Sequence, residues 1–381
     1  MNPTGLLAGL FLVLAGAGLL YLVAAIVFVG RIASRRVPSV AATPAVTVLK
    51  PLHGAEPRLF ENLSSFLRQD YRGPVQVVFG VQNARDPAIE VVRALERAFP
   101  GATVDLVIDA SLHGSNRKVS NLINMAKRIR HEIVVLADSD MVVAPDYLRR
   151  IVDELHVPGV GAVTCLYHGV AAGNVWSRLS ALAIETHFLP SVAVGLGLGL
   201  AQPCMGSTIA LRRETLEAIG GFRAFAHDLA DDYLVGAAVR RLGLKVAVTP
   251  FTIGHACTER SFRDLVGQEL RWVRTIRQID PGGHAGSVVA HPLPLALLAL
   301  ALSPGYVAAC FVAAAILLRM GLYLAVKRAF GLKAQVYGLA PLRDLLSFGI
   351  FVASFFGRGV SWRGHSYDVT STGVLTAKTR H

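Results

Sequence analysis

The sequence predicts an α/β domain with an open, mostly parallel sheet and helices on both faces, together with transmembrane or interfacial helices. Two observations support this prediction. Short apolar segments alternate with helical segments between residues 46 and 137, and such alternation is typical of parallel sheets covered on both faces. Residues 1–30 and 281–318 contain no Asp, Glu, Lys or Arg, and a helix needs roughly 20 apolar residues to cross a bilayer.

The alternating segments define the strands and helices of the first half of this domain. The apolar run 133–137 is uninterrupted, as expected for a central strand buried on both faces. In such sheets ligands bind beyond the carboxyl ends of the strands, so polar side chains that directly follow a strand are the first candidates for a site. The predicted order is strand 46–49 (stopping at Pro51), helix 59–67, strand 75–81, helix 88–99, strand 104–108, helix 120–130 and strand 133–137.

Composition indicates a chain that works at a membrane. Only 17% of its residues are charged and its mean hydropathy is +0.48, which is too apolar for an ordinary soluble enzyme. The net charge of +12 comes from scattered basic residues without a nucleic-acid-binding motif, so we expect no nucleic-acid partner and attribute it to attraction to anionic lipid headgroups. The four cysteines have neither paired nor zinc-binding spacing.

The first 30 residues are expected to form an uncleaved anchor. A signal peptide has a basic start and an apolar stretch of about 7–15 residues. Here the start is uncharged, the stretch is longer, and Arg31, Arg35 and Arg36 follow it, which places its C-terminal end in the cytoplasm. The expected organisation is an anchor at 1–30, a juxtamembrane linker at 31–44, a cytoplasmic domain at 45–280, membrane helices at 287–357 and a cytoplasm-proximal tail at 358–381.

The C-terminal third is expected to return to the membrane. Residues 287–303 and 305–326 predict a helical pair turned at Ser303-Pro304-Gly305. The apolar piece 345–357 is short enough for a re-entrant or interfacial segment, whereas extending it back to residue 336 makes a span. Three spans plus a re-entrant helix and four spans therefore both remain open. Residues 174–190 predict an interfacial or a buried helix, and Gly195 to Gly199 a flexible loop.

Asp138 and Asp140 directly follow the strand 133–137 in an Asp-x-Asp pattern. This position brings carboxylates to the carboxyl end of a strand, where a diphosphate and a divalent cation can meet. Hard oxygen ligands suit Mg²⁺ or Mn²⁺, which is the cofactor that we expect. The alternative is a pair of acids in a surface turn.

Three polar residues earlier in the chain have two interpretations each. Asp86 either caps the helix 88–99 or accepts hydrogen bonds from a nucleotide base. Lys118 and Asn121 stand ahead of a helix, where they either contact a diphosphate or are simply solvated.

Two further groups complete the candidate site. Asp231 and Asp232 either cap a helix or, near apolar neighbours, provide a carboxylate with a raised pKa suited to a general base. Gln268, Arg271 and Trp272 have i, i+3, i+4 spacing and so lie along one helix face. There a planar guanidinium can hold an anionic group and an indole can form a pocket wall.

Taken together and in this order, the motifs resemble the inverting family-2-type glycosyltransferases, in particular their ceramide glucosyltransferase-like branch and its bacterial relatives that attach N-acetylglucosamine to hopanoid lipids. The resemblance covers nearly the whole chain. Its motifs are Val46 to Gly54, Asn62-Leu, Gln69-Asp-Tyr71, Asp86-Pro-Ala-Ile89, Asn116-Arg-Lys-Val-Ser-Asn-Leu122, Ala137-Asp-Ser-Asp140, Gly220-Gly-Phe222, Ala230-Asp-Asp-Tyr233, Gln268-x-x-Arg-Trp272 and Ser361-Trp-Arg-Gly364.

The resemblance implies a nucleotide-diphospho-sugar transferase fold and a role for each residue. Asp232 would be the catalytic base, with Asp231 as its neighbour. Asp138 and Asp140 would hold the metal. The implied nucleotide-sugar contacts are Pro51, Asp86, Lys118, Asn121 and Asp138, and the implied sugar or acceptor contacts are Asp231, Gln268, Arg271, Trp272 and His187.

The implied reaction moves GlcNAc or Glc from a UDP-sugar to the hydroxyl of a membrane lipid, with a hopanoid polyol as first choice and ceramide as the alternative. The implied location is a bacterial cytoplasmic membrane, crossed several times, with the catalytic domain facing the cytoplasm. Two rivals are a processive polysaccharide synthase, which shares these acids, and a degenerate fold retained as a membrane scaffold.

Overall fold

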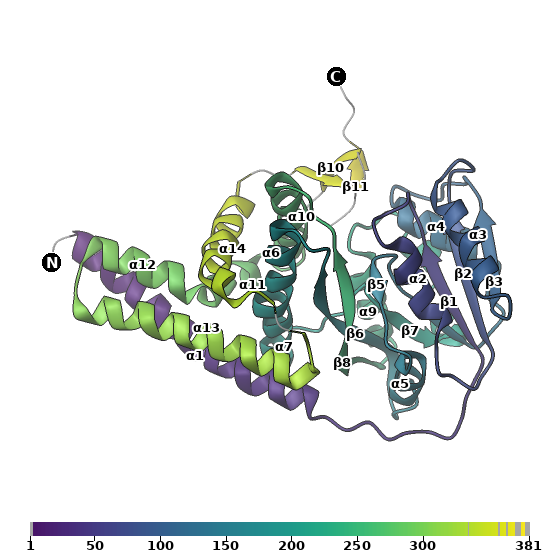
Figure 1. Cartoon of the computed structure of the whole chain (residues 1–381), viewed down its shortest axis with the longest axis horizontal. Coiled ribbons are helices and arrows are strands. Elements are labelled where there is room, and N and C mark those ends of the chain that lie inside the picture. The colour runs from purple at the N-terminus through teal and green to yellow at the C-terminus, as the bar shows by residue number, and fades with distance from the viewer. Residues whose placement is uncertain (1–2, 334, 357–358, 363–364, 370–374, 378–381) are drawn as a thin grey trace.

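The computed structural model describes residues 3–333, 335–356, 359–362, 365–369 and 375–377. Two parts differ in character: a mixed sheet with its helices, and a bundle of apolar helices that extends away from it, with the N-terminus at the far end (Figure 1). The last two residues of the Ser361-Trp-Arg-Gly364 motif lie outside the described residues.

The large sheet has eight strands in the order β3-β2-β1-β4-β7-β6-β8-β5. Strands β3, β2, β1 and β4 run parallel, β7 is antiparallel to both neighbours, β6 and β8 are parallel, and β5 is antiparallel to β8. The predicted mostly parallel sheet is therefore confirmed. Its strands are β1 (Val46–Pro51), β2 (Val75–Val81), β3 (Thr103–Ile108), β4 (Ile133–Leu136), β5 (Met141–Val142), β6 (Val160–Ala171), β7 (Ile209–Arg212) and β8 (Lys245–Cys257).

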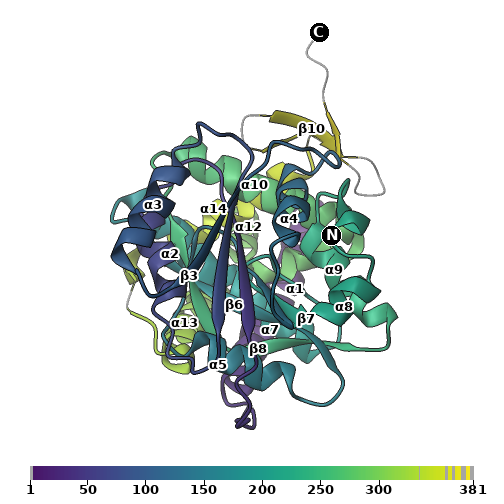
Figure 2. The same ribbon diagram turned by 90° about the vertical axis from the view of Figure 1, so that its right-hand side faces the viewer.

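Helices cover both faces of this sheet (Figure 2). Helices α2, α3 and α5 pack on one face, where alternate residues of β1 such as Val46 and Val48 point. Helices α4, α8 and α9 pack on the other, which receives Leu49. Strands with two buried faces need continuous apolar sequence, which is why these strands could be predicted. The helices are α2 (Leu59–Leu67), α3 (Ala88–Ala98), α4 (Arg117–Ala126), α5 (Tyr147–Leu155), α8 (Arg213–Ala218), η2 (Phe222–Phe225) and α9 (Asp231–Arg241).

Helix α4 begins three residues before its predicted start. The Asn116 side chain accepts a hydrogen bond from the Val119 amide at 3.1 Å and so caps the helix. This cap places Lys118 within the first turn, and the site depends on that position.

The remaining elements lie between the sheet and the distal end of the bundle. Three described helices are long and apolar enough to cross a membrane, Pro3–Ala33, Val175–Gly197 and Tyr306–Phe330, although the second is mostly buried within the protein. The elements are α1 (Pro3–Ala33), α6 (Val175–Ala183), η1 (Ile184–Phe188), α7 (Leu189–Gly197), α10 (Phe262–Ile279), α11 (Pro281–Gly286), η3 (Ser287–Ala290), α12 (Pro292–Leu302), α13 (Tyr306–Phe330), η4 (Tyr337–Leu339), α14 (Ala340–Ser354) and a small antiparallel sheet of β9 (Gly359–Trp362), β10 (His365–Val369) and β11 (Leu375–Ala377).

Three predictions about the membrane side differ from the structure. The expected helix 287–303 is broken at His291, with a bend of 67°, because the residue before a proline disfavours helical backbone. Of the piece 345–357, the residues up to Ser354 belong to α14, which begins at Ala340 and is not among the long apolar helices. The expected loop from Gly195 is helical as far as Gly197, where α7 ends.

A buried polar cluster connects the bundle to the rest of the protein. The Arg319 guanidinium of α13 donates to the Asp344 carboxylate of α14 at 3.0 Å, and also to the carbonyl oxygens of Thr186 and Ala290 at 2.8 and 2.7 Å. His187 of η1 contacts the other Asp344 oxygen at 2.9 Å. One carboxylate therefore joins three segments that are distant in sequence.

Replacing Asp344 by Ala should destabilise the protein by about 3–5 kcal/mol, because a buried Arg319 would lose its counterion. Denaturation in mixed detergent micelles measures this loss. Glu90→Ala is the matched control, since Glu90 pairs with Arg93 at an exposed surface and should cost under about 1 kcal/mol. Equal losses in the two variants would show that the cluster contributes no more than a surface pair.

Candidate functional site

A cavity of about 620 Å³ lies where the carboxyl ends of β1 and β4 meet the amino end of β7 and the first turn of α9. This is the edge of the sheet at which the sequence placed the site. Most of the predicted residues line it, namely Pro51, Lys118, Asp138, Asp140, Asp231, Asp232, Gln268, Arg271 and Trp272.

Asp138 and Asp140 follow β4 in a turn that several groups support. The Lys50 ammonium of β1 donates to the Asp138 carbonyl oxygen, and the Ser139 hydroxyl donates to Glu56 at 3.0 Å. Lys50 is fully buried and stands 3.7 Å from the centre of the Phe66 ring. Burial lowers the pKa of Lys50 to about 7, although the nearby carboxylates oppose this shift.

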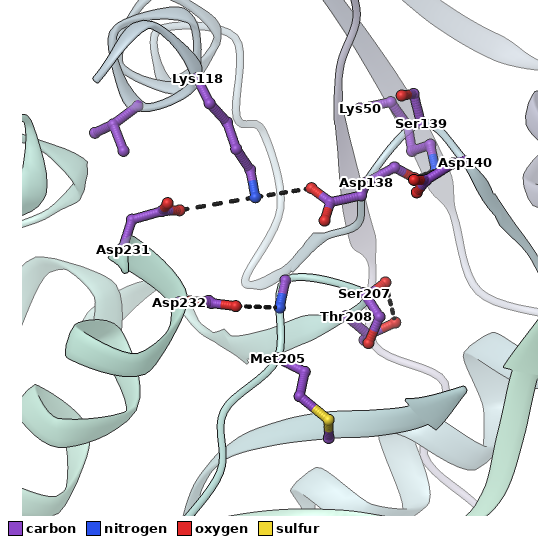
Figure 3. Close-up of polar contacts among 12 residues, drawn as sticks. Lys50, Lys118, Asp138, Ser139, Asp140, Met205, Ser207, Thr208, Asp231 and Asp232 are labelled. Atoms are coloured by element: carbon purple, nitrogen blue, oxygen red, sulfur yellow. Dashed lines mark hydrogen bonds and ion pairs between the residues drawn. The ribbon is translucent and has the colours of Figure 1, made fainter. Parts of the chain in front are cut away.

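Lys118 lies between two carboxylates from different elements (Figure 3). Its ammonium is 2.7 Å from Asp138 Oδ1 and 3.7 Å from Asp231 Oδ2. Burial acts to lower the pKa of Lys118, but the carboxylates of Asp138, Asp231 and Asp232 reverse this and raise it above the usual value. Lys118 is therefore a permanent cation at the centre of the acids.

Asp231 and Asp232 begin α9 and differ in their surroundings. Asp231 is buried and accepts a hydrogen bond from Asn116 at 3.3 Å. Asp232 is half-buried and accepts the backbone amides of Gly206 at 2.9 Å and Tyr233 at 2.8 Å. Burial raises the pKa of both carboxyls, that of Asp231 to about 6, while Lys118 opposes the rise. Carboxylates with raised pKa values are suited to accepting a proton near neutral pH.

The face of α10 that carries Gln268, Arg271 and Trp272 closes the cavity on the side toward the helix bundle. The Ser261 side chain caps this helix by accepting from the Asp264 amide at 3.1 Å. From its other side, Glu269 receives a bidentate contact from the buried Arg343 of α14. The membrane-side helices thus hold α10 against the site.

His255 is a site residue that the sequence analysis missed. It lies near the end of β8, lines the cavity, and its Nδ1 is 3.5 Å from Asp140 Oδ2. Among the residues that the structure describes, neither ring nitrogen of His255 has a hydrogen-bond partner, nor does the buried Asp140 Oδ1. A single His in a largely apolar strand is a weak sequence signal, and only the pairing of β8 with β5 brings it to Asp140.

These orphaned atoms fit a divalent cation. Carboxylate oxygen and imidazole nitrogen are both suitable ligands for Mn²⁺. Within the part of the chain that the structure describes, no three His, Cys, Asp or Glu side chains converge on one point. Asp140 and His255 are therefore a partial ligand set, and Asp138 is engaged by Lys118.

Three predicted residues do not line this cavity. Asp86 accepts the backbone amides of Gly54 at 3.0 Å and Ala88 at 2.9 Å, so it supports a loop and the start of α3. Asn121 donates to the Gly80 carbonyl oxygen at 2.8 Å at the end of β2. His187 belongs to the polar cluster around Asp344.

Comparison with known proteins agrees with this architecture. The model of glycosyl transferase family 21 matches residues 10–375, nearly the whole chain. This chain belongs to glycosyl transferase family 21. The predicted resemblance to ceramide glucosyltransferase-like proteins is thereby confirmed.

Individual relatives share only about a quarter of their residues with this chain over the matched regions. Ceramide glucosyltransferase 1 of Caenorhabditis elegans is 26% identical over 235 residues, which are 61% of this chain and 49% of the relative. An N-acetylglucosaminyltransferase of Bradyrhizobium diazoefficiens is 25% identical over 240 residues, again 61% and 49%. The chain therefore spans about half the length of the curated relatives it matches.

A solved structure shares the fold over nearly the full length. It is a mannosyltransferase from Pyrobaculum calidifontis, in complex with GDP-Man and Mn²⁺, which is 22% identical and has a TM-score of 0.58. The match covers 93% of this chain and 99% of that one.

Replacing Gly206 by Ala should reduce sugar transfer, the reaction for which the family is named, by about tenfold to hundredfold. An added Cβ would lie 2.9 Å from Asp138 Oδ2 and 3.1 Å from Lys118 Nζ, so the charged groups must move apart. Initial rates and thermal unfolding would be measured together. Gly267→Ala, in open space on α10, should keep full activity. An unchanged rate in Gly206→Ala would show that this spacing is unimportant.

Proposed function

We propose that this protein is a membrane-bound inverting glycosyltransferase that moves GlcNAc or Glc from a UDP-sugar to the hydroxyl of a membrane lipid. The observation that carries the proposal is a single cavity. Asp232 lines it, Lys118 lies in it between the carboxylates of Asp138 and Asp231, and Gln268, Arg271 and Trp272 of α10 close it. Family membership supports the reaction class.

In this proposal the residues at the strand ends bind the donor. Lys118 supplies a cation for the diphosphate oxygens, and Pro51 forms part of the wall. Asp140 and His255, together with Asp138, would hold a Mg²⁺ or Mn²⁺ ion. Such an ion neutralises charge on the departing diphosphate when it is bound. The mannosyltransferase that shares this fold binds a nucleotide sugar and Mn²⁺, which supports the assignment.

Asp232 is the proposed base of a single displacement. Its carboxylate takes the proton from the lipid hydroxyl as that oxygen forms a bond to the anomeric carbon. The bond between this carbon and the diphosphate oxygen breaks, and its electron pair leaves with UDP. Attack from the opposite face inverts the anomeric carbon and gives a β-glycoside. The Gly206 and Tyr233 amides keep the Asp232 carboxylate in one orientation throughout.

The proposal also names a lipid acceptor and a location. A hopanoid polyol is the first choice and ceramide the alternative, since relatives include both an N-acetylglucosaminyltransferase and ceramide glucosyltransferases. A processive polysaccharide synthase is the more distant rival. The bundle of apolar helices supports a multi-pass membrane location. We propose a bacterial inner membrane with the domain of residues 45–280 on the cytoplasmic side, because Arg31, Arg35 and Arg36 follow the first apolar helix.

Purified protein with Mn²⁺ should transfer a single sugar when UDP-GlcNAc or UDP-Glc is offered with bacteriohopanetetrol or ceramide, as measured by mass spectrometry of the lipids. Asp232→Asn should lower the rate by about 10²–10⁴-fold because the base is lost, while UDP-sugar binding is retained. Asp146→Asn is the control, since its side chain caps no helix. A ladder of products would instead identify a synthase, and joint loss of binding and transfer in Asp232→Asn would refute its assignment as base.

Removing divalent metal with EDTA should abolish transfer, and Mn²⁺ or Mg²⁺ should restore it. Asp140→Asn and His255→Gln should each raise the half-saturating metal concentration about tenfold or more, because each removes one proposed ligand. His131→Gln is a matched control, because residue 131 precedes β4 at the opposite end of that strand. Metal-independent transfer by the unaltered protein would contradict the cofactor assignment.

A further inference from the structure

The cavity is lined by two chemically distinct groups of residues. The carboxylates and Lys118 form one group. The other is apolar and comes from η1, α7 and α10, which lie between the sheet and the helix bundle (Figure 1). The diphosphate and the sugar of a nucleotide sugar are polar and make no use of such a wall. The apolar lining residues on these three elements are Phe188, Val192, Ile276 and Ile279.

The apolar wall is continuous with the membrane helices. On α7, Leu189, Ala193 and Val194 pack into one buried cluster with Leu22 and other apolar residues of α1. The same short helix places Val192 at the cavity. Helix α7 therefore contacts α1, which is long and apolar enough to cross the bilayer, and it also contributes Val192 to the cavity.

Large apolar side chains remain exposed where this wall meets the surface. Ile276 and Ile279 on α10 are 48% and 37% exposed. Leu198 and Leu200, in the segment that leads from α7 to the cavity, are 55% and 75% exposed. Exposed apolar side chains that line a cavity, as Ile276 and Ile279 do, mark a ligand-binding surface or a contact with lipid.

We propose that this apolar wall, between α7 and α10, holds the hydrocarbon portion of the acceptor lipid next to its reacting hydroxyl. The acceptor then reaches Asp232 from the bilayer by moving along α7 and α10, without leaving the hydrophobic phase. This inference rests on the proposed function and adds the acceptor's binding surface and route to it. The occupant is a membrane lipid because the wall is continuous with α1.

The kinetic test uses the full chain in lipid nanodiscs with whichever acceptor, ceramide or bacteriohopanetetrol, the unaltered protein glycosylates. Ile276→Gln should raise the KM for this lipid about tenfold, because a polar amide replaces an apolar contact. The KM for the UDP-sugar and the slow hydrolysis of the UDP-sugar by water should not change. A merely structural defect would alter all three quantities.

Leu242→Gln is the matched control. Leu242 caps the C-terminus of α9, is 45% exposed, and is not among the residues that line the cavity. The two variants therefore make the same kind of change at the same exposure, and only Ile276→Gln should affect the lipid KM. Equal lipid KM values for the two variants would overturn the proposal.

A photocrosslink provides a second readout that needs no turnover. A benzophenone amino acid at position 276 should capture the acceptor lipid on illumination in the nanodisc, and one at position 242 should not. Where neither acceptor is glycosylated, the same experiment is run with vesicles of phosphatidylethanolamine and phosphatidylglycerol. Capture of a bilayer lipid at 276 supports the wall, and its absence there refutes it.

The two experiments separate the inference from the function on which it rests. Absence of transfer to any lipid by the unaltered protein refutes the proposed function, while the crosslink still tests the wall. Normal transfer combined with no crosslink at position 276 and an unchanged lipid KM in Ile276→Gln refutes lipid binding at the apolar wall. The proposed glycosyltransferase function would then still stand.

Discussion

The structure depends on bringing four aspartate carboxylates to one cavity, where like charges repel strongly once water is excluded. Lys118 makes this possible by lying between Asp138 and Asp231. Two backbone amides stabilise Asp232. The acids come from the end of β4 and the start of α9, and the cation from the first turn of α4, so the site exists only when the sheet and the helical layer that contains α4 and α9 are assembled.

The membrane helices contribute to the same site through buried ion pairs. Arg343 of α14 holds Glu269 of α10, and the same helix α10 carries Gln268, Arg271 and Trp272 toward the cavity. Next to Arg343, Asp344 joins Arg319 and His187. Buried pairs add little net stability compared with apolar packing, but removing one partner is costly. Here the pairs fix the position of α10 relative to the membrane-side helices and to the acids of the cavity.

Several site residues could be predicted because their signal is local. Asp138 and Asp140 follow an apolar run that is typical of a central strand, and Gln268, Arg271 and Trp272 share a face by helical spacing alone. Asp86 and Asn121 carry the same kind of signal, yet they support backbone at the ends of β1 and β2 and do not line the cavity. A polar residue after a strand is thus compatible with either role, and only its partners distinguish them.

The sequence by itself determined the parallel strands β1 to β4, the apolar helices and the acids of the site, because hydrophobic periodicity and motif spacing are properties of short segments. Tertiary structure alone decided that His255 faces Asp140, since this requires β8 to pair with β5 across more than a hundred residues of sequence. It also decided that α7 contacts both α1 and the cavity. Such relations depend on which surfaces pack together, and no local pattern encodes them.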